Sequence, residues 1–141
     1  MMKKYCTITC ILVALLLTSC GQKKINRDYI PILKENLFKL QEAVKEQNLA
    51  QIDSLLSVKI IEKKQSSDSL IRYVYGPDNQ FNFYQFGDAQ ITYTNEVARI
   101  DCYIMDSTSA TDRPLVFYLE FDDGLWLFTS FKEGTDSVRE D

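Results

Sequence analysis

Hydrophobic residues recur along this chain with two different periods. From residue 28 to about residue 57 they return every three or four positions, the spacing of a helix that buries one face. From residue 81 onward they alternate with polar residues, which is the spacing of a half-buried strand. Helices that come first and strands that follow predict an α+β fold, in which N-terminal helices pack on one face of an antiparallel β-sheet.

The first predicted helix covers residues 28–47. Asp28 is placed to cap its start, and Pro31 falls in the first turn, where a missing N–H costs little. Charged residues cover much of one face, which is therefore expected to be solvated. The opposite face carries an apolar stripe formed by Ile30, Leu33, Leu37, Leu40 and Val44.

Two shorter helices are predicted after the first one. Asn48 is a suitable cap for a second helix that runs to about Ser57. Residues 59–67 then form a polar connection. A third helix is predicted for residues 67–75, where Gly76 ends it, although the same stretch also suits a strand.

The strand-like segments begin at residue 81. Gly87-Asp88, a turn-forming pair, separates the first two segments. Asp122-Asp123-Gly124 predicts a tight hairpin before the last strand. The predicted strands are residues 81–86, 89–94, 96–105, 115–121 and 125–131. In the third of them the residues expected to face inward are Ala98, Ile100, Cys102 and Ile104.

Aromatic side chains are concentrated in the strand region, because 14 of the 17 lie between residues 73 and 131. A sheet this aromatic forms either a well-filled core or the wall of a pocket. Strict alternation through residues 81–86 puts two rings on each side of the first strand. The pairs are Phe81 with Phe83, and Tyr84 with Phe86. Rings on both sides predict a strand that is covered twice, the second time by another copy or a partner protein.

Residues 1–19 have the features of a secretory signal. A basic start at Lys3 and Lys4 leads into a short, mostly apolar run. The end of this run, Leu17-Thr18-Ser19-Cys20, resembles the signal of bacterial lipoproteins. The resemblance implies cleavage before Cys20 and attachment of diacylglycerol to its sulfur. The alternative is an ordinary secretory signal that contains a cysteine.

The signal divides the chain into four parts. Residues 1–19 are the signal peptide, residues 20–27 a lipidated tether, residues 28–132 a single α+β domain and residues 133–141 a flexible tail. The tether reaches at most about 25 Å when fully extended. The domain is long enough for one hydrophobic core and too short for two.

Charge and composition argue against several classes of function. Removal of the signal leaves 14 Lys and Arg against 20 Asp and Glu, a net charge of −6, which argues against a nucleic-acid partner. The chain has no histidine, which removes Ser-His-Asp triads, Cys-His pairs and His-containing zinc sites. Asp122 and Asp123 are adjacent and lack the spaced loop that calcium prefers. We therefore expect no metal and no cofactor.

Cysteine usage leaves one free thiol in the mature chain. Cys6 and Cys10 leave with the signal and Cys20 carries the lipid, so Cys102 has no disulfide partner. Its position among inward-facing residues predicts a small buried hydrophobe in place of a reactive thiol.

Asp101 and Tyr103 are the candidate catalytic residues. They share one strand face with Arg99, and a carboxylate beside a hydroxyl donor is the arrangement that a proton-transfer site needs. The alternative is a solvated or dimer-forming outer face, because the opposite face of the same strand is apolar. Trp126 and Phe128 share a face of the last strand, where packing is expected before ligand stacking.

The order of elements resembles the nuclear transport factor 2-like superfamily, a cystatin-like cone, over residues 28–132. The resemblance rests on residues 47–49, where one helix ends and the next begins, and on residues 122–128, an acidic turn followed by Gly, Leu and Trp. It implies a sheet that curves around the long first helix and leaves a pocket at the open end. Some members are isomerases or polyketide cyclases, and others bind ligands or dimerise through the sheet.

These observations predict a lipid-anchored protein of the bacterial cell envelope. We expect it to be non-catalytic and to bind a small apolar ligand, another envelope protein or a second copy of itself. Gly21-Gln22-Lys23-Lys24 lacks the acidic residues of a surface-export signal, which favours a periplasm-facing membrane. The alternatives are an isomerase or cyclase that uses a pocket carboxylate, and an immunity or inhibitor lipoprotein.

The anchor gives the first testable prediction. Cys20→Ser removes the sulfur that carries the acyl chains, and no polybasic patch replaces them, so the protein is expected to move from the membrane to the soluble fraction. Cell fractionation followed by immunoblotting measures this. Full membrane retention of Cys20→Ser would contradict lipid attachment.

Overall fold

The computed structural model describes residues 27–108 and 112–135 and confirms an α+β fold with helices before strands. The four strands form one antiparallel sheet in the order β1-β2-β3-β4. Among the described residues, no helix is both long and apolar enough to cross a membrane. The elements are α2 (Ile30–Lys45), α3 (Leu49–Leu55), the 3-10 helix η1 (Val58–Lys63), α4 (Ser67–Tyr75), β1 (Phe83–Tyr93), β2 (Val97–Asp106), β3 (Arg113–Asp122) and β4 (Leu125–Glu133).

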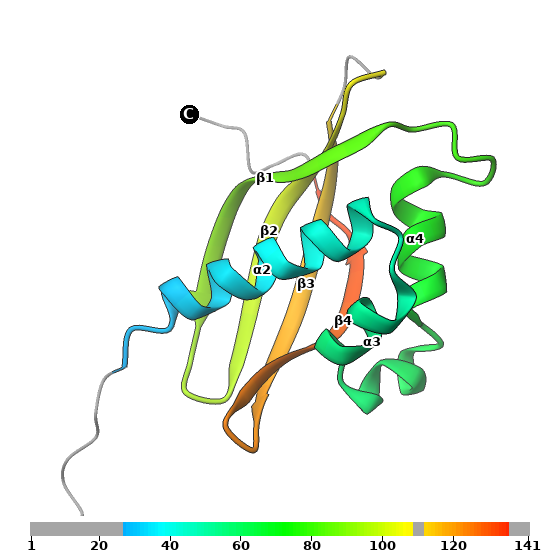
Figure 1. Cartoon of the computed structure of the whole chain (residues 1–141). Coiled ribbons are helices and arrows are strands. Elements are labelled where there is room, and N and C mark those ends of the chain that lie inside the picture. Colours follow the sequence, from blue (N-terminus) through cyan, green and yellow to red (C-terminus); the bar gives the residue numbers. More distant parts are fainter. Residues whose placement is uncertain (1–26, 109–111, 136–141) are drawn as a thin grey trace, which may run out of the picture.

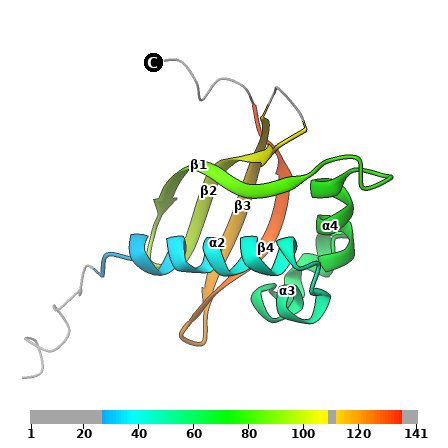
Figure 2. The same cartoon turned by 45° about the horizontal axis from the view of Figure 1, so that its top comes forward.

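The helices form one layer and the sheet forms the other (Figure 1). Helix α2 crosses one face of the sheet, while α3, η1 and α4 gather beside β4, and the turned view agrees (Figure 2). We call the face under α2 the inner face and the opposite one the outer face. This arrangement leaves the outer face without a covering helix.

Helix α2 buries the predicted stripe. Leu33, Leu37, Leu40 and Val44 are all buried in the core. The helix begins at Ile30, two residues later than predicted, and Asp28 Oδ1 accepts a hydrogen bond from the Ile30 N–H at 3.0 Å. Pro31 lies in the first turn as expected.

The segment between α2 and α4 corrects one prediction. Asn48 caps α3, and its side chain accepts a hydrogen bond from the Gln51 N–H at 3.2 Å. The helix ends at Leu55, earlier than predicted, because the following chain is extended and the Ser57 N–H donates to a carbonyl of β4. Residues 59–67 are not a simple polar connection, since η1 forms there and buries Ile60. Helix α4 matches the prediction, and Gly76 with φ 78° ends it.

Strand β1 corrects a second prediction. Residues 81–86 and 89–94 are not two strands, because Gly87-Asp88 forms no turn and β1 continues to Tyr93. Two register shifts relative to β2 accommodate the extra residues, one between Phe83 and Gln85 and one between Gly87 and Gln90. The chain reverses instead after Tyr93, at residues 94–97.

The first of these shifts also overturns the predicted faces of β1. Phe83 and Phe86 are both buried in the core with ring centroids 4.7 Å apart, so they lie on the same side. Tyr84 is 46% exposed. Phe86 therefore lies on the inner side with Phe83, and not with Tyr84 as predicted. A partner over this strand stays a prediction.

Strands β2, β3 and β4 follow the predicted alternation, with ends that differ by one or two residues. Ala98, Ile100, Cys102 and Ile104 are buried on the inner face. Asp123 and Gly124 have φ values of 49° and 82°, and this consecutive left-handed pair forms the tight hairpin between β3 and β4. Trp126 and Phe128 are buried, as expected for packing.

Strand β4 forms one edge of the sheet, and the helical layer covers this edge. Backbone carbonyls along this edge accept hydrogen bonds from side chains and backbone of the preceding helices, which protects the edge from pairing with other strands. The bonds run from Asn36 Nδ2 to the Trp126 carbonyl (3.0 Å), from the Ser57 N–H to the Phe128 carbonyl (2.7 Å) and from Gln65 Nε2 to the Phe131 carbonyl (2.6 Å).

The buried stripe of α2 gives the second prediction. Leu37→Asp places an unpaired charge where the side chain is 6% exposed, and unfolding is expected to become easier by at least about 3 kcal/mol. Phe38→Asp is the matched control, because the neighbouring Phe38 is 59% exposed. Urea denaturation followed by circular dichroism measures both. Equal stabilities for the two variants would mean that α2 is not the core helix.

Candidate functional site

The interior between α2 and the sheet is filled by side chains. A chain of aromatic contacts runs through it, from Phe86 to Phe117 at 5.3 Å and from Phe117 to Phe128 at 5.2 Å between ring centroids. Phe117 and Phe128 are each 1% exposed, and the residues of α2 that face them are buried as well. Close packing of this kind leaves no room for a ligand among these residues.

A second aromatic cluster closes the end of the domain where α2 begins. The ring of Tyr29 lies 5.2 Å from Trp126, 5.8 Å from Phe121 and 5.8 Å from Tyr93, measured between centroids. The Tyr93 hydroxyl donates to Asp28 Oδ1 at 3.3 Å, which ties the tip of β1 to the residue before α2. These contacts fill the space between the start of α2 and the strand tips.

The candidate carboxylate Asp101 lies on the outer face, opposite the filled interior. Its two oxygens accept hydrogen bonds from Arg99, Oδ2 from Nε at 2.9 Å and Oδ1 from Nη2 at 2.8 Å. This two-pronged bond raises the pKa of Arg99 above its ordinary value. Asp101 therefore holds a guanidinium in place and is not poised as a base above an empty cavity.

Tyr103 shares the outer face with Asp101, as predicted, but it is not solvated. The side chain is 4% exposed. Val116, which pairs with Asp101 on the same face, is only 2% exposed as well, so this part of the outer face is shielded from water. The structure thus places both candidates on one face, where Asp101 is hydrogen-bonded to Arg99 through both oxygens and Tyr103 is buried.

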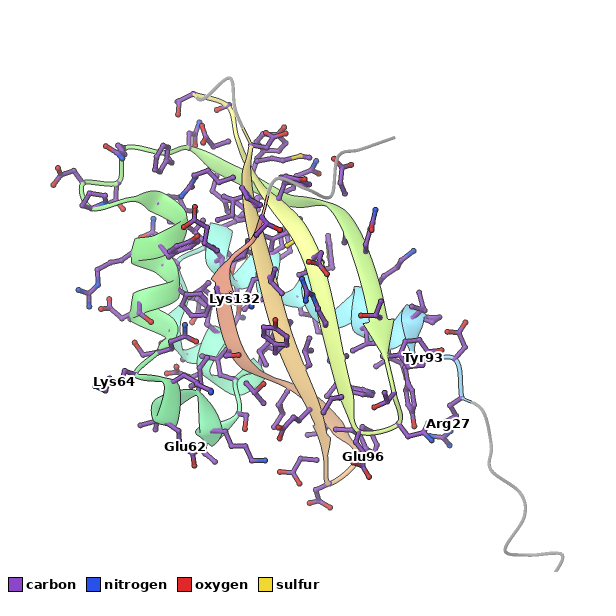
Figure 3. All side chains as sticks on the ribbon, turned by 180° about the vertical axis from the view of Figure 1, so that it is seen from behind. Arg27, Glu62, Lys64, Tyr93, Glu96 and Lys132 are labelled. Carbon is purple, nitrogen blue, oxygen red and sulfur yellow. The ribbon has the colours of Figure 1, made fainter. Side chains whose placement is uncertain are left out.

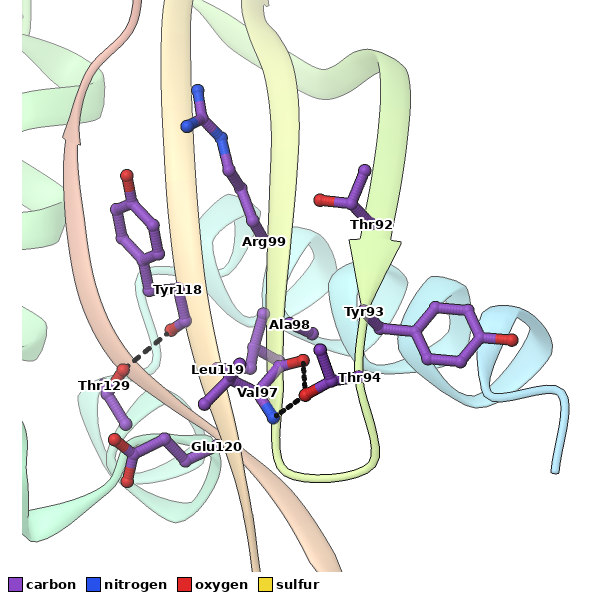
Figure 4. A pocket seen from close by; sticks show the side chains of 10 residues that line it. All are labelled: Thr92, Tyr93, Thr94, Val97, Ala98, Arg99, Tyr118, Leu119, Glu120 and Thr129. Carbon is purple, nitrogen blue, oxygen red and sulfur yellow. Dashed lines mark hydrogen bonds between the residues drawn. The ribbon is translucent and has the colours of Figure 1, made fainter. Parts of the chain in front are cut away.

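The described residues form a groove on the outer face (Figure 4). It has a volume of about 360 Å³ and crosses from the end of β1 to β4. Figure 3, turned by 180° from Figure 1, looks directly onto the outer face, with Tyr93 and Glu96 toward one side and Lys132 toward the other. The residues that give the groove its character are Thr92, Thr94, Val97, Arg99, Tyr118 and Thr129.

Tyr118 is the aromatic centre of this groove. The Arg99 Cζ atom lies 5.9 Å and the Lys132 Nζ atom 5.3 Å from its ring centroid, so two cations flank one ring. Thr129 donates to the Tyr118 carbonyl at 3.2 Å, where the register shift between Tyr118 and Leu119 falls. A ring with cations and hydroxyl groups around it suits recognition of a polar surface, and it contains no activated nucleophile or free base.

Sequence analysis missed Arg113, which joins the helical layer to the sheet. Its guanidinium donates to the Tyr73 carbonyl at 2.9 Å and to the Val74 carbonyl at 2.6 Å, at the end of α4. It also lies 4.0 Å over the ring of Phe81. Burial lowers the pKa of Arg113 from its ordinary value. No sequence pattern reveals these contacts, because the acceptors are backbone carbonyls of a distant helix.

Cys102 is buried on the inner face, and burial raises the pKa of its thiol above the ordinary value of 9.0. The thiolate is the reactive form of cysteine, so a raised pKa makes this side chain inert at neutral pH. Its position agrees with a packing role.

Metal binding finds no support in the described parts of the chain. Within residues 27–108 and 112–135, no group of three or more Cys, Asp or Glu side chains is arranged to hold an ion. Cys20, the predicted lipid site, lies outside the described residues, as do the signal peptide and most of the tether.

No protein-family model matches this chain, and no curated protein is significantly similar to it.

The buried thiol gives the third prediction. The unfolded chain releases the Cys102 proton near pH 9 while the folded chain retains it, so stability is present in full below pH 9 and falls as the pH rises above it. Cys102→Ala removes this contribution. Urea unfolding from pH 8 to 10 is therefore expected to show a steeper loss of stability for the original chain than for the variant. Parallel losses would contradict a thiol that stays protonated in the fold.

Proposed function

We propose that this chain is a lipid-anchored protein of the bacterial cell envelope that binds another envelope protein through the outer face of its sheet. One observation carries the choice of surface. The interior is filled by Phe117, Phe128 and the stripe of α2, whereas the outer face has a groove of about 360 Å³ around Tyr118, whose ring is flanked by two cations. A small apolar ligand would have to displace core side chains, while a protein partner needs no interior space.

The membrane part of the proposal rests on the sequence around Cys20. Two or more acyl chains on Cys20 would hold the protein stably at the membrane, whereas a single acyl chain gives only marginal membrane binding. Arg27, the first described residue, lies directly before α2, and a tether of residues 20–27 holds the domain within about 25 Å of the lipid. Such a short tether favours a partner that is itself at the membrane surface.

The nuclear transport factor 2-like cone remains part of the proposal. Support comes from α2 lying across the sheet, from the cap at Asn48 and from the acidic hairpin that leads into Trp126. This fold hosts enzymes and binding proteins alike, so it does not decide the function.

Catalysis of the isomerase or cyclase type is the less favoured function. It needs a carboxylate that faces substrate, whereas both oxygens of Asp101 are bonded to Arg99. An immunity or inhibitor lipoprotein would be a special case of the favoured function, in which the partner is a toxin.

The fourth prediction tests the binding surface in cells. A photo-crosslinking residue at Lys132, exposed on the outer face, is expected to give one discrete protein adduct. The same residue at Arg72, whose side chain is exposed on α4, is the matched control and should give none. Tyr118→Ala is expected to lower the yield from position 132 by about tenfold, since interface aromatics carry much of the binding energy.

Immunoblotting and mass spectrometry of the adducts decide the result. Adducts from position 72 alone, or no adduct from either position, would contradict the proposal. A lipid-sized or metabolite-sized adduct from position 132 would replace the protein partner by a small ligand.

A further inference from the structure

The two edges of the sheet are treated differently by the rest of the chain. The β4 edge is covered by bonds from Asn36, Ser57 and Gln65. At the β1 edge, the described residues protect the part around Phe86, whose N–H donates a hydrogen bond to Gln41 Oε1 at 3.0 Å. The remaining part of this edge is formed by residues 89–94.

In the part of β1 that follows the second register shift, the N–H and C=O groups of alternate residues point away from β2. The Thr94 N–H donates to the Val97 carbonyl at 2.8 Å and closes the hairpin to β2. Because antiparallel pairs alternate between bonded and non-bonded positions, the N–H and C=O groups of Tyr93 and Ile91 point away from β2. No described residue forms a hydrogen bond with these outward groups.

The start of α2 forms an apolar shelf above this open edge. In both Figure 1 and Figure 2 the first turn of α2 extends past β1, beyond the border of the sheet. This turn carries Ile30, which is partly buried and lies on the same side of α2 as the buried Leu33. A strand added to β1 would therefore lie beneath an apolar cover.

The side chains along the edge carry no charge that would repel an added strand. Residues 89–94 are uncharged, although exposed edges are commonly protected by lysine or proline. Carboxylates stand at both ends of this stretch, Asp88 at the register shift and Glu96 in the hairpin, and both are exposed. Arg27 and Asp28 line the surface beside Tyr93 and Thr94. With Arg27 outnumbered by Asp28 and Glu96 there, the edge is neutral in the middle and net acidic at its ends.

We propose that the β1 edge at residues 89–94 takes up an extended segment of the partner protein as a fifth strand. The segment pairs with the outward groups of Ile91 and Tyr93 and places alternate apolar side chains under Ile30. Basic residues at its two ends complement Asp88 and Glu96. The inference rests on the proposed function, since the segment belongs to the envelope partner. Thr92 and Thr94 belong to both surfaces, so the added strand continues the outer groove.

A single segment fits this edge better than a second copy of the domain. A copy related by a two-fold axis at β1 would bring its own α2 over the same border that the first α2 already crosses. A segment needs only the width of one strand, about 4.8 Å.

A synthetic peptide tests the edge on the purified full-length chain. The probe has alternating threonine and valine in its centre, one lysine at each end and blocked termini, and isothermal titration calorimetry measures its affinity. Two versions are N-methylated, one at the valine amides and one at the threonine amides. Strand addition uses amides of one parity, so one version is expected to bind at least tenfold more weakly and the other within threefold of the parent. No binding of the parent, or equal effects of both methylations, would overturn the proposal.

A pair of variants locates the binding on β1. Thr92→Lys adds a positive charge beside the edge and is expected to weaken the peptide at least tenfold. Ser130→Lys is the matched control, because Thr92, Arg99, Tyr118 and Ser130 are successive partners across the sheet and Ser130 lies at the covered edge. Equal affinities for both variants would overturn the location. Peptide binding needs neither membrane nor partner, so its failure leaves cross-linking at Lys132 as a separate test of the proposed function.

Discussion

The burial of the α2 stripe against the inner face of the sheet is the interaction on which the rest of the structure depends. Leu33, Leu40 and Val44 meet rings from β3 and β4 that are themselves almost fully buried. Core packing at this density excludes water and ligand from the interior. Because the chain has no disulfide among its described residues, this packing has to supply much of the stability.

Because side chains fill the interior, the polar and charged groups that could recognise a partner lie on the outside of the domain. The polar residues of β2 and β3 lie on the outer face, where Arg99 holds Asp101 and flanks Tyr118. Edge protection is also uneven, since the helical layer covers β4 and leaves the lower half of β1 open. Both features favour recognition of another protein over turnover of a small molecule.

Periodicity predicted the parts of the fold in which local and tertiary preferences agree. The stripe of α2, the cap at Asn48 and the alternation along β2 were all visible in the sequence. Strand β1 was predicted wrongly, because Gly87-Asp88 favours a turn locally while pairing with β2 decides the register. The helix η1 was missed because a short 3-10 helix has no extended apolar period.

For the candidate site, the alternation of residues along a strand predicted which side chains share a face and nothing more. Alternation placed Asp101 and Tyr103 on one face, but it gave no sign that Tyr103 and Val116 are buried on that face. Arg113 was missed because its acceptors are carbonyls of α4, forty and thirty-nine residues away. The groove around Tyr118 was not predicted either, because the pairing of β3 with β4 is what brings Thr129 and Lys132 beside this ring.

Side chains alone occupy the space between α2 and the inner face of the sheet. Xenon enters dry apolar cavities, so a crystal of this protein pressurised with xenon tests this packing directly. We expect no xenon atom between α2 and the inner face. A well-occupied xenon atom among Leu40, Phe117 and Phe128 would contradict it and return the interior to consideration as a ligand site.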